Sequence, residues 1–90
     1  MRARRSTVVD EYAEDGQVVV YSSSGMVVVL SELAGVAWES LGEDWTTAED
    51  LAAALVQVFG EPPEGGTAIE MTERALRTLE GHGLVELDEA

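Results

Sequence analysis

The sequence lacks cysteine and lysine entirely, and it has one histidine among 90 residues. The absence of cysteine excludes a disulfide framework and a cysteine-ligated zinc site. A metal ion would therefore need mostly carboxylate ligands, but the acidic residues occur singly along helical faces and form no calcium-loop pattern. We expect neither a metal site nor another cofactor.

Positive charge and long apolar runs are also scarce. Eighteen acidic residues against five arginines give a formal net charge of −13. Nucleic acids and anionic membranes attract proteins through Lys and Arg, so neither is an expected partner. The basic start Met1–Arg5 is not followed by the apolar run of a signal peptide, and no stretch approaches the length of a membrane span. We expect the whole chain to be the mature, soluble, cytoplasmic protein.

The most informative stretch that is present is Val18–Leu30, VVVYSSSGMVVVL. Two runs rich in β-branched residues flank Ser22–Gly25, a pattern that predicts a β-hairpin. Both faces of this hairpin are apolar, yet the chain has too few strands to cover both of its edges, so one strand edge is left open. The predicted register pairs Tyr21 with Met26, Val19 with Val28, and Gln17 with Leu30.

The other segments complete a single small domain, which 90 residues can fold without cross-links. Residues 1–7 are expected to be a flexible basic tail, and residues 8–90 one domain. Val8–Glu14 predicts an edge strand, and the turn Asp15–Gly16 leads into the hairpin. Capping patterns predict helices over 32–41, 48–59 and 68–80, with an extended segment at 84–87. The fold class is therefore α+β, with three antiparallel strands, three helices and a short C-terminal extended segment.

Single residues offer little catalytic chemistry. His82 lies between two glycines with no serine, threonine or carboxylate at a spacing typical of a triad, and it is interpreted as a helix C-terminal residue. Gly35 interrupts the first helix and indicates a close contact with a neighbouring element. Arg74 and Arg77 either pair with nearby glutamates of their own helix or contact a partner. No catalytic residue is predicted, and the chain is not expected to be an enzyme.

The order of these elements resembles the PqqD-like family, the small winged-helix domains known as RiPP recognition elements. The resemblance covers residues 17–87. A strand ends at Leu30–Ser31 and enters a helix with a large apolar residue, a threonine-acidic helix start follows, and a leucine-rich pattern ends the last helix. These positions are Leu30, Ser31, Trp38, Leu41, Thr47 to Asp50, Leu76, Leu79, Gly83 and Leu84.

The resemblance implies a winged-helix-like fold and a specific function. Members of this family bind the leader of a ribosomally made precursor peptide as an extra strand beside the third strand, against the third helix, and present it to a modifying enzyme or leader peptidase. Carried onto this chain, the peptide-binding residues are Met26, Val27, Val28, Val29 and Leu30 of the strand, and Met71, Arg74, Ala75, Arg77 and Thr78 of the helix.

The resemblance favours a lasso-peptide or related pathway, with biosynthesis of a PQQ-type cofactor as the alternative. Two functions of another class stay open: a winged-helix transcription regulator and a small acidic scaffold protein. Charge argues against the regulator, because the predicted third helix carries two arginines against three glutamates. The expected partners are thus a leader peptide and a pathway enzyme.

Overall fold

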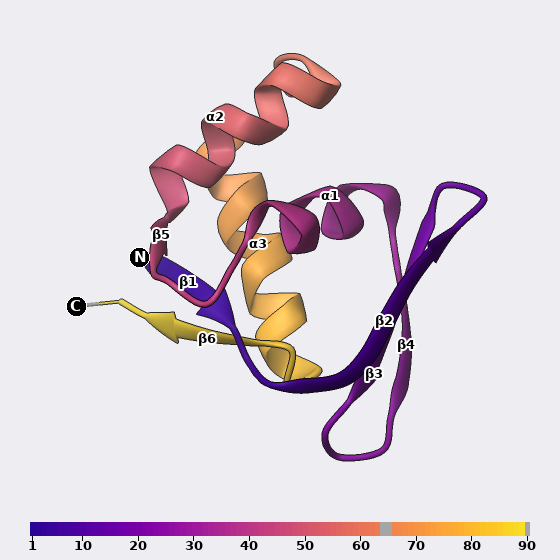
Figure 1. The fold of residues 1–90 in the computed structure, drawn as a ribbon. Helices are drawn as coiled ribbons and strands as arrows, with labels where there is room; N and C mark the ends of the chain where they lie inside the picture. The colour runs from indigo at the N-terminus through magenta and orange to yellow at the C-terminus, as the bar shows by residue number, and fades with distance from the viewer. Residues whose placement is uncertain (64–65, 90) are drawn as a thin grey trace.

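The structure is a computed structural model, and it describes residues 1–63 and 66–89. An antiparallel sheet in the order β2-β3-β4 stands beside a group of three helices (Figure 1). Its strands are β2 (Val8–Glu14), β3 (Gln17–Ser22) and β4 (Val27–Leu30), and the helices are α1 (Glu32–Ser40), α2 (Ala48–Phe59) and α3 (Ala68–Gly81). The predicted α+β class and the order of three strands followed by three helices are confirmed.

The hairpin of β3 and β4 forms as predicted, but its predicted register is wrong by one residue. The Ser22 amide donates to the Met26 carbonyl (2.9 Å), so the connection is the three-residue loop 23–25. Gly25 takes a φ of +90°, which glycine adopts without steric cost, and the Ser22 hydroxyl accepts from the Met26 amide (3.1 Å). The observed pairs are Val18 with Leu30, Val19 with Val29, Val20 with Val28, and Tyr21 with Val27.

This register decides which side chains of the sheet face the helices. Val18, Val20, Val28 and Leu30 belong to the hydrophobic core, whereas Val27 and Val29 are exposed on the other face. A shift of one residue exchanges the two faces of a strand, which is why a one-residue error in loop length changes the predicted core.

Residues 2–5, within the expected flexible tail, instead form a strand. β1 (Arg2–Arg5) is the middle strand of a second sheet, between β5 (Thr46–Thr47) and β6 (Val85–Asp88). Ala3 is fully buried, while Arg2 and Arg4 project to the opposite side, where they contact Trp45 (4.8 and 4.4 Å from guanidinium carbon to ring centre). The first residues of the chain are thus part of the domain, and the predicted C-terminal extended segment is the strand β6.

The three predicted helix starts are confirmed by their capping hydrogen bonds. In each case a serine or threonine hydroxyl oxygen accepts from a backbone amide in the first turn, satisfying one of the free donors there. The bonds run from Ala34 to Ser31 (3.2 Å), from Asp50 to Thr47 (3.1 Å) and from Glu70 to Thr67 (3.1 Å). His82 is the C-terminal cap of α3, as the sequence indicated. Between α2 and α3, residues 64 and 65 lie outside the described part of the chain.

A polar cluster fixes the sheet to α1. The fully buried indole of Trp38 donates from Nε1 to Glu11 Oε2 of β2 (2.6 Å). Arg5 stacks on that indole (4.2 Å), pairs with Glu11 (3.0 Å) and donates to the Trp38 carbonyl (2.8 Å). Close packing adds to this link, since a β-carbon on Gly35 would lie 3.1 Å from Cγ2 of Val18, and the predicted close contact at this glycine is confirmed.

Candidate functional site

The outer edge of β4 is the open side of the sheet. β4 pairs with β3 on one side, and within residues 1–63 and 66–89 no strand pairs with its other edge. In antiparallel sheets, every second residue directs its amide toward the neighbouring strand. Because Ser22 and Met26 form a bonded pair at the hairpin end, Val28 directs its amide to β3. The amides of Val27 and Val29 therefore point outward, toward any strand that joins the sheet.

An apolar cavity lies between α3 on one side and, on the other, the first turn of α1 with Ser31, the residue that links β4 to α1. Its volume is about 200 Å³. α3 contributes four of the five helix residues predicted for the site, and the linking residue brings the cavity next to the end of β4. The lining residues are Met71, Arg74, Ala75 and Thr78 of α3, together with Ser31, Leu33 and Ala34. We call this cavity the strand-side cavity.

The two arginines of α3 differ in their surroundings. Arg77 lies outside the strand-side cavity and pairs with Glu89 (2.8 Å). Arg74 lines the cavity and has no ion pair with the carboxylates of the described residues. The predicted alternative of pairing within the helix is therefore absent for Arg74, whose guanidinium is available to a carboxylate from outside.

The predicted strand residues divide into two kinds. Val28 and Leu30 bury their side chains in the core, and by the alternation of the sheet both direct their amides to β3. Val27 and Val29 direct their amides outward, and each residue is more than half exposed. Met26 is exposed too, but it precedes β4 and lies at the end of the hairpin loop.

Three cavity residues were not predicted from the sequence. Ser31 was named as a position of the family resemblance but not as a peptide-binding residue, and Leu33 and Ala34 belong to the first turn of α1. Their place in the sequence could have indicated a part in the site, because these residues follow directly after the strand whose edge is open. Leu33 is half-buried, which shows that the apolar side of α1 extends past the core into the cavity.

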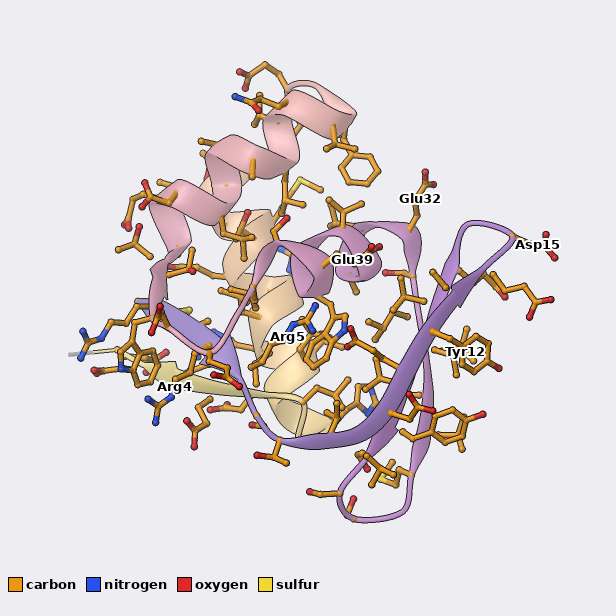
Figure 2. The ribbon with its side chains drawn as sticks, in the orientation of Figure 1. Arg4, Arg5, Tyr12, Asp15, Glu32 and Glu39 are labelled. Carbon is orange, nitrogen blue, oxygen red and sulfur yellow. The ribbon has the colours of Figure 1, made fainter. Side chains whose placement is uncertain are left out.

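The face of the sheet opposite the helices carries two tyrosines. Tyr12 projects from β2 away from the helices (Figure 2), and its ring lies 6.0 Å from that of Tyr21 between ring centres. A hydrogen bond with the Tyr21 side chain, together with the nearness of that phenol, raises the pKa of Tyr12 above its ordinary value. Such an aromatic pair stabilises the pairing of β2 with β3.

Residues 1–63 and 66–89 contain no cluster of three or more His, Asp or Glu side chains that could hold a metal ion. None of the helices formed by these residues is both long and apolar enough to cross a membrane.

Comparison with known proteins gives one match. A family model described as Coenzyme PQQ synthesis protein D (PqqD) matches residues 16–85. The matched range runs from the turn before β3 to the start of β6, and it includes both the open strand edge and α3. No curated protein and no solved structure matches the chain. Because the matched residues make up most of its length, the chain belongs to the PqqD family.

Proposed function

We propose that this protein binds the leader segment of a ribosomally synthesised precursor peptide as an added strand along β4 and presents it to a modifying enzyme or leader peptidase. Membership in the PqqD family supports a peptide-binding, chaperone-like role in place of a catalytic one. The observation that carries the proposal is the position of the strand-side cavity: an edge with two outward amides ends beside an apolar hollow on α3.

The two features have complementary roles in peptide binding. Backbone bonds to Val27 and Val29 supply affinity that does not depend on the leader's sequence. Side chains alternate along a strand, so those of the leader that face inward meet Met71 and Ala75 in the strand-side cavity, while those that face outward lie beside the exposed valines. Arg74 at the cavity favours an acidic residue in the inward set.

For the pathway, we propose lasso-peptide biosynthesis or a related peptide pathway. A second candidate is the biosynthesis of the PQQ cofactor, and the description of the matching family favours it. The two are distinguished by the peptide that binds, since each pathway has its own precursor. The test is titration of the protein with synthetic leaders of both classes, together with the leader of any precursor encoded beside this chain.

Charge opposes the DNA-binding alternative. Four of the five arginines pair with carboxylates of the chain itself, and the net charge is −13. Binding to a phosphate backbone would need several free cations, and among the described residues Arg74 is the one arginine without an ion pair. We expect no specific duplex binding at physiological salt in a gel-shift or anisotropy assay, and submicromolar affinity for a defined DNA site would contradict the proposal.

Amide hydrogen exchange tests strand addition residue by residue. In the free protein, the outward amides of Val27 and Val29 have no sheet partner and exchange readily, whereas the amide of Val28 is bonded to β3. Saturation with the leader should slow exchange at Val27 and Val29 and leave Val28 as it was. A scrambled leader of the same composition is the control. If the leader binds while the two outward amides keep their exchange rates, the peptide does not add to β4.

A further inference from the structure

A second cavity continues from the strand-side cavity along the helices. Its volume is about 250 Å³, and it lies between the end of α2 and the start of α3. Leu33 and Met71 line both cavities, so the two hollows are neighbours that share a wall. Leu55 and Phe59 supply further apolar lining from α2. We call this hollow the helix-end cavity.

The helix-end cavity exposes apolar surface to a marked degree. Phe59 is the last residue of α2, and 41% of its surface is exposed, although its ring lines the cavity. Leu55, one helical turn earlier in α2, is almost fully buried and lines the same cavity. A partly exposed aromatic residue beside buried apolar lining is typical of a binding pocket, since the aromatic side chain loses contact with water when a ligand enters.

The charge at the helix-end cavity differs from that at the strand-side cavity. Glu61 is the charged residue of its lining, and no basic residue lines it within the described part of the chain. The strand-side cavity carries Arg74 instead. A peptide that crosses both cavities is therefore attracted by an acidic residue at one point and by a basic residue at the other.

We infer that the helix-end cavity holds one large apolar side chain of the leader, aromatic or of the size of leucine, next to a basic residue that faces Glu61. This inference rests on the proposed function. A cavity of about 150 Å³ is enough for a benzene ring, so 250 Å³ accommodates one such side chain. The anchor residue lies outside the segment paired with β4, because the strand-side cavity, which begins at Ser31, separates the helix-end cavity from the strand.

Charge also makes a second copy of this chain the less suitable occupant. Each copy carries a net charge of −13, and the cavity lining is itself acidic, so two copies repel one another at this surface. A leader segment with a basic residue beside an apolar anchor matches the apolar lining of the cavity and also its acidic residue, Glu61. Self-association is nevertheless measured in the test described below.

The test compares two neighbouring residues at the end of α2. Phe59→Ser removes the ring from the helix-end cavity, and Val58→Ser is the matched control, because Val58 is 60% exposed and does not line either cavity. Leader affinity is measured by calorimetric titration, and folding by thermal unfolding. We expect affinity to fall about tenfold in Phe59→Ser and less than twofold in Val58→Ser.

An alanine scan of the leader supplies a measurement that does not depend on the folding of a variant. Replacing the anchor should weaken binding to the wild-type protein about tenfold but have little further effect on Phe59→Ser, because the two changes remove the same contact. Glu61→Lys should weaken binding as well, whereas Glu49→Lys, a charge reversal at the start of α2, should not.

The possible outcomes separate this inference from the proposed function. If the wild-type protein binds no leader, the proposed function fails and the anchor fails with it. If the leader binds and protects the β4 amides but Phe59→Ser behaves like Val58→Ser, the anchor alone is refuted. If Phe59→Ser changes sedimentation of the free protein and leaves leader affinity intact, the cavity serves self-association, and the inference is again refuted.

Discussion

Replacing Val29 with proline separates the folding of β4 from its capacity to accept a peptide. Proline removes the amide hydrogen and places a ring where that hydrogen was. At Val29 the amide points away from β3 and the residue is 57% exposed, so the free protein loses no bond to β3 and little buried surface. We expect the unfolding free energy to fall by about 1 kcal/mol, chiefly through the altered strand conformation.

The same change acts directly on a peptide added to the sheet. It removes one backbone hydrogen bond, worth about 0.5 to 1.5 kcal/mol, and the ring obstructs the incoming chain. Leader affinity should therefore fall at least tenfold, which corresponds to about 1.4 kcal/mol. The measurement is calorimetric titration at a temperature well below the unfolding midpoint of the variant.

Two controls identify the amide as the cause. Val29→Ala trims the side chain and keeps the amide, so it should bind the leader within about threefold of the wild type, a difference below 1 kcal/mol. Val28→Pro removes the bond to Val20 within the sheet and disturbs a buried position, with a cost on the order of 3 kcal/mol in stability. If Val29→Pro folds and binds the leader with unchanged affinity, the edge of β4 is not the binding site, and the reasoning is refuted.

Three further predictions concern single contacts. Arg74→Glu should weaken the free energy of leader binding by about 1 to 3 kcal/mol. Arg77→Glu, on the same helix but outside the cavity, should change that free energy by less than about 0.5 kcal/mol. Equal effects of the two variants in titration would contradict the role assigned to Arg74. Glu11→Ala should lower the unfolding free energy by about 1 to 3 kcal/mol in urea denaturation, because the buried Trp38 indole loses its hydrogen-bond acceptor. An unchanged unfolding free energy would show that this hydrogen bond contributes nothing to stability. Gly35→Ala should destabilise by about 1 kcal/mol despite the better helix propensity of alanine, and a raised unfolding temperature would show that the sheet moves away at little cost.

Local sequence patterns predicted most of the elements, because their causes are local. The caps at Ser31, Thr47 and Thr67 depend on a hydroxyl and an amide three residues apart, and such spacing is visible in the sequence. The hairpin was equally visible, but its register depends on whether Ser22 belongs to the loop or to the strand. Sequence alone does not decide that, since the deciding bonds link the Ser22 amide and hydroxyl to Met26.

The N-terminal strand was missed for a different reason. Its alternation of Arg2, Ala3 and Arg4 is too short to distinguish from a basic tail, and the partners that bury Ala3 come from residues 46–47 and 85–88. Contacts across such separations leave no local periodicity. Met71, Arg74, Ala75 and Thr78, which the family resemblance named, are spaced three or four residues apart or are adjacent along α3, and they line one cavity. Their role in peptide binding stays a prediction.

The pairing of β1 with β6 constrains the order of events during synthesis. Arg2 pairs with Asp88, so β1 can form its pairing with β6 only after more than 80 further residues have been synthesised. At the usual rate of about 5 to 20 residues per second, that interval is roughly 4 to 17 s. The hairpin of β3 and β4 ends at Leu30, so all its residues are synthesised well before Asp88 is available to close the second sheet. All residues of the edge that we propose for peptide binding are therefore made early in translation, while the second sheet, built on the two distant strands, can be completed only at the end.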